Sequence, residues 1–253
     1  MRLLSAGALL ILFTLAREGS KNIIGILKSR DLPKLLLFAV MGMMTVQYTY
    51  LMAIKYTNSG TATVIQYSGP AFILLYVCLK MHRSPTWREN ISLIGILIGV
   101  YLIATHGHWD TLVISRLGLL WGVASAIFLA VHDVMPIAII RNWGALTVTG
   151  LSMFIGGICL ALLTRPFHYA PALTLDATVT FAAMVVIGTV YSFTAFLIGV
   201  SHIGPVNASI TACIEPIGAS IFSFLWVGTR FTSVDIAGMI IILALCQITL
   251  VII

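Results

Sequence analysis

An acidic residue next to a proline stands within an apolar stretch of this sequence. Glu215 immediately precedes Pro216 in the run Val206–Val227. Proline removes one backbone donor and frees a carbonyl of the preceding turn, so the pair can open a polar notch in a helix. A carboxyl there could take up and release a proton, whereas a purely structural Glu215 would stay protonated and bond a neighbouring helix. The position predicts a proton-coupling role for Glu215.

A histidine and an aspartate are adjacent in a second apolar run. His132 and Asp133 lie in the later part of Leu117–Ile140, ahead of Pro136. The pair could relay a proton or hold a cationic or zwitterionic solute. Neighbouring residues on a helix point about 100° apart, so both side chains are not expected to face one cavity squarely. In the alternative interpretation, Asp133 lies near an interface and pairs with Arg141.

The amino-acid composition indicates what surrounds these polar groups. The chain is 60% hydrophobic and 9% charged, with a mean hydropathy of +1.07, whereas soluble domains carry about 25% charged residues. Lipid must therefore surround much of the chain. The net charge of +6 comes from cations between apolar runs, which argues against nucleic acid as a partner. The four scattered cysteines form neither a metal motif nor a disulfide framework, and no cofactor is expected.

Nine apolar runs are candidates for helices that cross a bilayer, although the first and the fourth are short. Crossing the hydrocarbon core takes about 20 apolar residues, and lipid cannot satisfy open backbone groups, so helix is the expected form. The predicted spans are Met1–Ala16, Leu35–Ile54, Gly60–Leu79, Asn90–Thr105, Leu117–Ile140, Ala145–Leu163, Ala177–Val200, Val206–Val227 and Val234–Ile253. A signal peptide is the alternative for the first run, although the internal repeat gives that run a place in the fold.

The cations are distributed unevenly between alternate loops, and this bias predicts the orientation. The side with more cations is expected to be cytoplasmic, which also places the C-terminal residue Ile253 inside. The cations on that side are Arg17, Lys21, Lys28, Arg30, Lys34, Lys80, Arg83, Arg88 and Arg141.

An internal repeat relates the two parts of the chain. A shift of 146 residues places Tyr50-Leu51 on Phe196-Leu197 and Pro70 on Pro216. We predict a first repeat over residues 1–113 with four spans and a second over 114–253 with five. An odd number of spans inverts one copy relative to the other, an arrangement typical of alternating-access transporters.

Related motifs stand at corresponding places in the two halves. One covers Tyr50–Ala62 and is followed by Pro70, and the other covers Ile203–Ala208 and is followed by Glu215-Pro216. On these motifs the chain resembles the EamA-type members of the drug/metabolite transporter superfamily. The resemblance implies ten spans, five per half, with the missing first helix upstream of Met1. A start codon set too far downstream and a truncated relative are the two explanations.

The sequence departs from the family pattern at two helix ends. Members often place Leu-Gly-Glu at the ends of the fourth and ninth helices, where this chain has Leu79-Lys80-Met81 and Val227-Gly228-Thr229. In the family the third, fourth and eighth helices line a central cavity, where rings can stack on a solute and amides can fix its polar ends. Ordinary hydrogen bonding between helices is the alternative role. The predicted substrate contacts are Gln47, Tyr50, Gln66, Tyr67, His132, Tyr191 and Phe193, with Glu215 and Asp133 for proton coupling.

Together these features predict an all-α, multi-pass protein of the cytoplasmic membrane with nine transmembrane helices from two inverted repeats. The expected function is secondary transport, without an enzymatic activity, of a small metabolite, amino acid or drug-like solute, outward by alternating access. The alternatives are a truncated, non-transporting paralogue and an intramembrane enzyme that combines His132 and Asp133 with a serine nucleophile, the candidates being Ser68, Ser125 and Ser192. The spacings Gly95-xxx-Gly99 and Gly118-xxx-Gly122 allow close helix packing or a homodimer.

Overall fold

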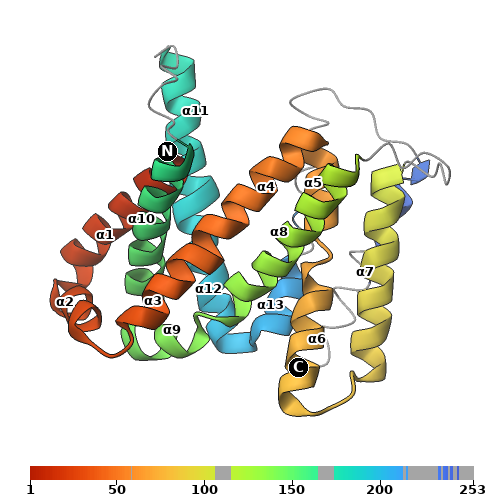
Figure 1. The fold of residues 1–253 in the computed structure, drawn as a ribbon, viewed down its shortest axis with the longest axis horizontal. Coiled ribbons are helices and arrows are strands. Elements are labelled where there is room, and N and C mark those ends of the chain that lie inside the picture. Colours follow the sequence, from red (N-terminus) through yellow and green to blue (C-terminus); the bar gives the residue numbers. More distant parts are fainter. Residues whose placement is uncertain are drawn as a thin grey trace. The chain divides into compact units, whose positions relative to one another are not determined.

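The computed structural model describes residues 1–57, 59–105, 115–164 and 174–212, Glu215 and several residues between 233 and 244. Every regular element in these ranges is a helix (Figure 1), as the predicted all-α class requires. The predicted span Val234–Ile253 and the later part of Val206–Val227 lie outside the ranges described continuously.

Four helical stretches in the described ranges are long and apolar enough to cross a membrane. A fifth candidate is a pair, α1 (Arg2–Glu18) and α2 (Lys21–Lys28), bent by 115° at the break between them. Two shorter apolar helices, Gly69–Lys80 and Glu89–Gly99, overlap two further predicted spans. The four long stretches are Leu32–Tyr56, Arg116–Trp143, Ala145–Thr164 and Leu175–Ile203.

Several of these stretches consist of consecutive helical elements. Leu32–Tyr56 contains α3 (Leu32–Leu37), the π-helical segment η1 (Phe38–Met44) and α4 (Thr45–Tyr56). The other elements are α8 (Arg116–Val134) with α9 (Ile137–Trp143), α10 (Ala145–Thr164), and α11 (Leu175–Val185) with the π-helical segment η3 (Val186–Tyr191) and α12 (Ser192–Ile203).

The predicted span Gly60–Leu79 is broken, in contrast to the expectation of one helix. It forms α5 (Ser59–Gln66) and α6 (Gly69–Met81), separated by a turn at Tyr67-Ser68. Pro70 in the first turn of α6 lacks the N–H that would continue the helix. Ser68 Oγ donates to the carbonyl of Ile65 at 2.7 Å, which satisfies one of the acceptors freed at the break.

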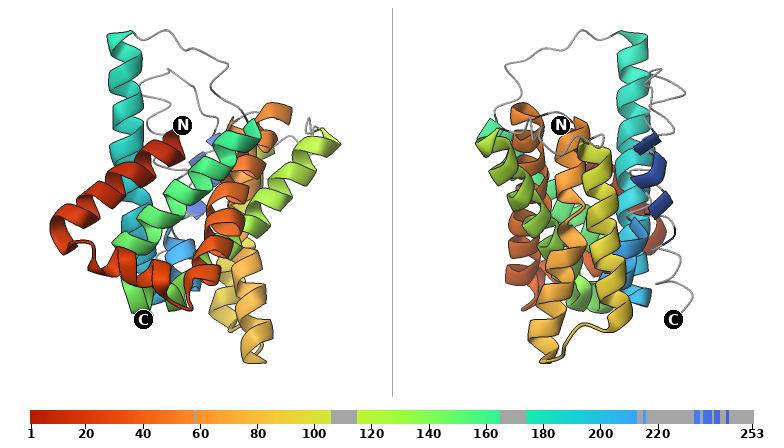
Figure 2. Two further views of the ribbon diagram at one scale, coloured as in Figure 1. Left: turned by 60° about the vertical axis from the view of Figure 1, so that its left-hand side comes forward. Right: turned by 90° about the vertical axis from the view of Figure 1, so that its right-hand side faces the viewer.

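Local residue chemistry fixes other helix boundaries. Gly204, with φ 81°, ends α12, and Pro205 then starts α13 (Pro205–Ala212) at a position where its missing N–H costs little. At the start of α7 (Trp87–Thr105), the backbone N–H of Thr86 donates to Glu89 Oε2 at 2.8 Å, and the N–H of Glu89 donates to Thr86 Oγ1 at 3.3 Å. This reciprocal pair is a capping box, and Figure 2 shows the turn that it follows, between α6 and α7.

The two π-helical segments carry hydroxyl side chains that bond five residues back. Thr45 Oγ1 donates to the carbonyl of Val40 at 2.8 Å, just after η1. Thr189 Oγ1 in η3 donates to the carbonyl of Met184 at 2.9 Å. The wider turn leaves carbonyls in a geometry that these hydroxyls can reach, and such segments occur frequently at functional sites.

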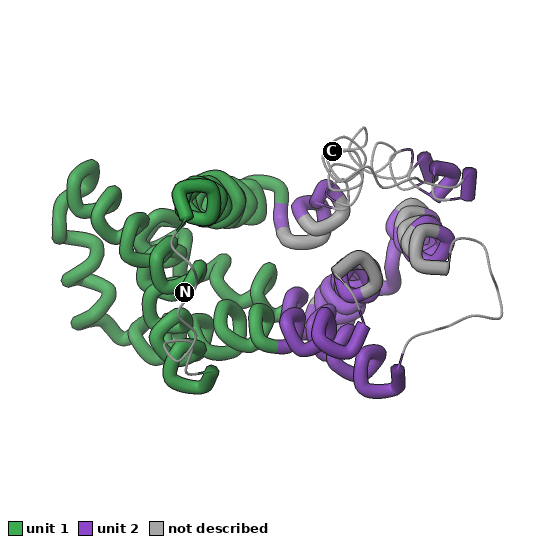
Figure 3. The backbone as a smooth tube through the Cα atoms, turned by 90° about the horizontal axis from the view of Figure 1, so that it is seen from above, with its two compact units in different colours: residues 1–48, 131–203 green, residues 49–130, 204–253 purple. Residues whose placement is uncertain are grey.

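The chain divides into two compact units (Figure 3), and the first is built around a glycine-lined contact between helices. This unit comprises residues 1–48 and 131–203. Its helices α1 and α10 run side by side (Figure 1). A Cβ on Gly157 of α10 would lie 2.6 Å from the backbone nitrogen of Leu4, and one on Gly7 of α1 would overlap the backbone of Phe154. Small residues therefore allow the two backbones to approach closely.

The second unit comprises residues 49–130 and 204–253 and also uses glycine at helix contacts. A Cβ on Gly122 of α8 would lie 2.8 Å from the side chain of Ile65, and Gly118 faces the side chain of Thr57. These glycines thus serve packing within the chain. Each compact unit contains segments of both predicted repeats, so the division into 1–113 and 114–253 remains a prediction about the repeat.

Candidate substrate and proton sites

The adjacent residues His132 and Asp133 form a buried hydrogen-bonded pair near the end of α8. Nδ1 of His132 lies 2.8 Å from Oδ1 of Asp133, and the two residues are 2% and 1% exposed. The two side chains therefore bond each other directly, and the expectation that they do not both face one cavity squarely stays a prediction. The alternative pairing of Asp133 with Arg141 is wrong: Arg141 is exposed, whereas Asp133 is buried against His132.

Three phenylalanine rings surround the imidazole of His132. Its ring centroid lies 5.7 Å from that of Phe38, 5.5 Å from that of Phe193 in an edge-on arrangement, and 6.3 Å from that of Phe196 in a stacked one. Nε2 of His132 is buried and has no hydrogen-bond partner within the described part of the chain. Of the predicted contacts, the structure thus brings His132, Asp133 and Phe193 together.

Gln47 is bonded to the first helix of the chain. Arg2 Nη2 donates to Gln47 Oε1 at 2.7 Å, which links α1 to the early part of α4 inside the first compact unit. The amide oxygen of Gln47 therefore already accepts a charge-assisted hydrogen bond, and the guanidinium of Arg2 lies beside it. Sequence reasoning singled out Gln47 but missed Arg2 as its partner.

The second compact unit contains three further predicted contacts. The hydroxyl groups of Tyr50 and Thr63 are 2.7 Å apart. Gln66 Nε2 donates to Ser125 Oγ at 2.7 Å, and Tyr67 is 8% exposed at the break between α5 and α6. Each of the two bonds connects neighbouring helices, so these residues hold the unit together as well as offering polar groups within it.

Two predicted residues are exposed. Tyr191, at the end of η3, is 71% exposed, and the structure does not bring it to the ring cluster around His132. Glu215 has helical backbone and an exposed side chain, whereas the adjoining Pro216 lies outside the described residues. The predicted roles of Tyr191 in substrate contact and of Glu215 in proton coupling therefore remain proposals.

The serines considered for an enzyme are engaged in other contacts. Ser68 and Ser192 donate to carbonyls of Ile65 and Ile187, and Ser125 accepts from Gln66. His132 bonds Asp133 through Nδ1 rather than a serine hydroxyl. In the described part of the chain, these contacts give none of the three serines a base.

A surface hollow of about 380 Å³ lies in the first compact unit, away from the predicted site residues. It is formed where α1 ends and where α12 approaches its last turn. Its lining residues are Arg17, Glu18, Ile140, Ala145, Leu146, Ile198, Ser201 and His202.

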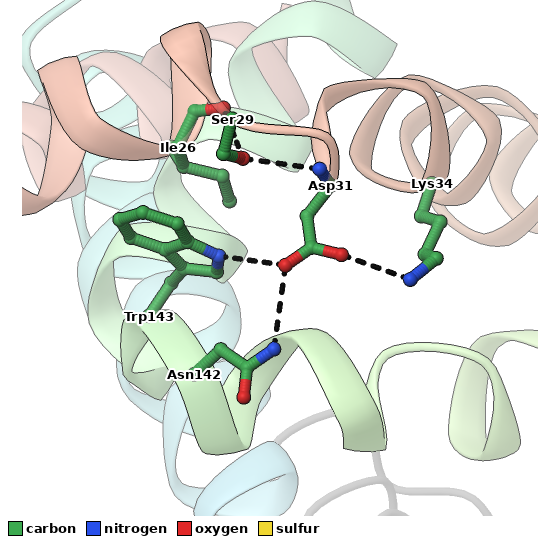
Figure 4. A network of polar contacts seen from close by, with 6 residues as sticks. All are labelled: Ile26, Ser29, Asp31, Lys34, Asn142 and Trp143. Atoms are coloured by element: carbon green, nitrogen blue, oxygen red, sulfur yellow. Dashed lines mark hydrogen bonds and ion pairs between the residues drawn. The ribbon is translucent and has the colours of Figure 1, made fainter.

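A polar network ties the turn between α2 and α3 to the end of α9 (Figure 4). Asp31 Oδ2 accepts from Trp143 Nε1 at 3.1 Å and from Asn142 Nδ2 at 3.3 Å, and Oδ1 accepts from Lys34 Nζ at 2.9 Å. The bonds from Lys34, Trp143 and Asn142, in that order, lower the pKa of Asp31 to about 2. Ser29 Oγ accepts from the backbone N–H of Asp31 at 3.1 Å and completes the turn.

The apolar helices and the polar side chains hydrogen-bonded inside them define a multi-pass helical membrane protein. The chain matches the EamA-like transporter family over residues 1–105 and 116–251, and it belongs to that family. This confirms the family suggested by the motifs around Tyr50–Ala62 and Ile203–Ala208.

Individual relatives extend this result. The chain is 38% identical over 251 residues to a Salmonella typhimurium (strain LT2) protein named "Uncharacterized inner membrane transporter YicL", covering 96% of this chain and 81% of that protein. It is 21% identical over 134 residues to a protein of Archaeoglobus fulgidus named "Uncharacterized transporter", covering 53% and 47%. One solved crystal structure superposes with a TM-score of 0.79 and 14% identity, over 99% of this chain and 85% of that one, and supports the fold.

Proposed function

We propose that the protein is a secondary transporter that exports a small metabolite, amino acid or drug-like solute across the cytoplasmic membrane. The observation that carries the proposal is the buried His132–Asp133 pair inside the span Arg116–Trp143. Ionisable groups are costly at membrane depth and are retained there chiefly for transport, relay or sensing roles. Membership of a transporter family and the name of the Salmonella relative support the same conclusion.

The proposed mechanism is alternating access between two inverted halves. The shift that relates the repeats places η1 on residues 184–190, of which 186–190 belong to η3. Matching irregular turns at matching places support the repeat, because an irregular turn is a local feature that unrelated helices seldom share. Broken and irregular helices are also the usual locations of solute sites in transporters with inverted repeats.

The proposed solute contacts are Gln47, Tyr50, Gln66, Tyr67, His132, Tyr191 and Phe193, with Asp133 and Glu215 in proton coupling. Amide and phenol groups would fix polar ends of the solute, and rings would stack on its flat part. The C-terminus is proposed to lie in the cytoplasm, as the loop charges predict.

The test compares the growth medium of cells that express this chain, its Glu215→Gln form or an empty vector. Untargeted mass spectrometry measures the solutes that accumulate outside the cells. We expect a small set of solutes to reach higher levels in the medium of cells that express this chain than in the vector control. We expect this increase to be lost in cells that express Glu215→Gln. A medium indistinguishable from that of the vector control, with the protein present in the membrane, would contradict transport. Enrichment that Glu215→Gln leaves unchanged would remove Glu215 from the mechanism and leave export standing.

A further inference from the structure

Nε2 of His132 is a buried nitrogen whose hydrogen-bonding capacity is unused. Nδ1 is committed to the Asp133 carboxyl at 2.8 Å, and Nε2 has no partner within the described residues. When the carboxylate accepts from Nδ1–H, the neutral imidazole must carry its lone pair on Nε2. The pair therefore presents one basic atom, at a fixed place in the first compact unit.

The surroundings of Nε2 suit a proton better than a larger ligand. The rings of Phe38, Phe193 and Phe196 enclose the imidazole, and His132 is 2% exposed. The hollow found in this unit is lined by other residues. A solute that bonded Nε2 would first have to displace one of these rings, whereas a proton adds to the lone pair with no change of volume.

Charge in this region is balanced within the pair itself. The segment η1 and the helix α10 contain no charged side chain. On α12 the titratable group is His202, which is exposed and bonded to the carbonyl of Ile198 at 2.8 Å. With Nε2 unprotonated the pair carries one negative charge, and with Nε2 protonated it is neutral overall. An enclosed apolar setting favours the neutral form, and such a pair titrates as a unit.

We propose that His132 and Asp133 form a one-proton site, with Nε2 as the atom that gains the proton and the ring-enclosed arrangement as its loaded state. The inference rests on the proposed transport function and specifies its coupling. A hydronium ion gives its proton to the Nε2 lone pair and leaves as water, while Nδ1–H keeps its hydrogen bond to Asp133, and release reverses that single step. Export would then exchange one proton for solute.

One enclosing ring belongs to an irregular helical segment and the other two follow one on the same span, which gives the site a means of opening. Phe38 is the first residue of η1, and Phe193 follows η3 on the same span. Conversion of a π-helical turn to an α-helical one changes the rotation of the side chains beyond it. Such a change would turn a ring away from Nε2 and admit water, so proton release is tied to the helix motion.

The decisive measurement is nuclear magnetic resonance of the purified full chain, with ¹⁵N-labelled histidine, in lipid nanodiscs titrated from acid to alkaline pH. His132→Gln assigns the signal by its loss, and His202→Gln is the matched control on an exposed histidine. We expect the His132 signal to pass between imidazolium and a neutral ring protonated at Nδ1, and Asp133→Asn to displace that titration. A neutral ring at every pH, or a titration unaffected by Asp133→Asn, would overturn the proton site.

A second variant covers the case in which His132→Gln does not accumulate. Phe193→Leu keeps the pair and removes a ring centred 5.5 Å from the imidazole. The His132 signal should then lose the contribution of Phe193 to its ring-current shift and exchange protons with water faster. Unchanged exchange would overturn the enclosed arrangement.

The comparison of growth media described for the proposed function distinguishes a failure of the transport proposal from a failure of the one-proton site. If the chain exports solutes but His132 does not titrate with Asp133, the proton site is overturned and transport stands. If His132 titrates as expected but no solute is exported, transport and the coupling to it are overturned, and the buried one-proton pair stands.

Discussion

The buried polar side chains that form hydrogen bonds in the described spans do so in two ways. Some return to their own helix, as Thr14 does by donating to the carbonyl of Leu10 at 2.7 Å. Others bond a different helix, as the buried Ser125 does by accepting from Gln66. A bond within one helix survives any movement of that helix, whereas a bond between helices holds only in one packing arrangement. Residues of the second kind should therefore contribute more to the stability of the assembled fold.

Ser125→Ala tests this at one residue. The change leaves the Gln66 amide without the acceptor that lies 2.7 Å away, at a serine that is 0% exposed. We expect the free energy of unfolding to fall by about 1–3 kcal/mol, the usual cost of stranding a buried polar group. Thermal unfolding in detergent measures it, with Ser201→Ala, whose hydroxyl bonds its own helix, as the control. Equal losses in the two variants would contradict the assignment.

Asp31 provides a pH-dependent prediction outside the apolar spans. Its folded pKa of about 2 lies below the ordinary value of 3.8, so the folded state binds this proton more weakly than the unfolded state. The resulting stabilisation is present above the unfolded pKa and is lost as pH falls through the folded value. We expect Asp31→Asn to lower Tm at neutral pH, with the gap to wild type closing below about pH 4.

Asp176→Asn, which alters an exposed acid in the first turn of α11, is the control for Asp31→Asn. Its melting temperature should follow that of the wild type across the same pH range. A gap between wild type and Asp31→Asn that persists unchanged down to pH 2 would show that the carboxylate charge does not hold the network together.

The sequence identified the polar residues of the candidate site better than their partners. Gln47, Gln66, His132 and Asp133 stand out because polar groups in apolar runs demand an explanation. Their partners include Arg2, Ser125 and the rings of Phe38 and Phe196, and pairing with these depends on how each helix is rotated. Spans that are apolar on all sides carry a weak signal for rotation. The repeat did give one clue to Phe196, because it aligns this residue with Tyr50, which is a predicted substrate contact.

At the scale of elements, glycine decides which helices can approach closely. Gly157→Ala would place a Cβ 2.6 Å from the backbone nitrogen of Leu4, and backbone cannot rotate out of the way as a side chain can. We expect α1 and α10 to separate slightly and the free energy of unfolding to fall by about 1–3 kcal/mol, as for other overpacked cores. Thermal unfolding in detergent measures the change.

Gly199→Ala is the matched control, because the same added Cβ meets nothing within 4 Å on α12. Alanine is also the better helix former by about 0.5–1 kcal/mol, so this variant should be as stable as wild type or more so. A Gly199→Ala loss as large as that of Gly157→Ala would mean that the contact between α1 and α10 is not the cause.

Hydropathy located the spans, whereas their irregularities were only partly predictable. Pro70 and Gly204 mark breaks by chemistry that any sequence reading can use, although the run Gly60–Leu79 was expected to continue through its proline. The segments η1 and η3 were missed, because a π-helical turn changes no residue type and follows from packing and from hydroxyls such as Thr45 and Thr189. A sequence that predicts a continuous helix does not reveal where one turn holds an additional residue, as a π-helical turn does.

At the scale of the whole molecule, loop charge makes a topology prediction. In a chain with its cysteines replaced by serine, Lys28→Cys and Lys55→Cys each introduce one thiol at an exposed position. A membrane-impermeant maleimide applied to spheroplasts should label Lys55→Cys, and should label Lys28→Cys only after permeabilisation. Labelling of both before permeabilisation, or the reverse pattern, would contradict the predicted orientation.

The close contact between α1 and α10 also has a consequence for how the protein is made. Gly7 and its neighbours are synthesised before the backbone that they fit, which belongs to a helix in the second half of this sequence. At about 5–20 residues per second, α1 waits on the order of ten seconds for its partner. During that interval its grooved face is open to other nascent or resident helices. A slow stretch of translation between the two helices would lengthen this interval.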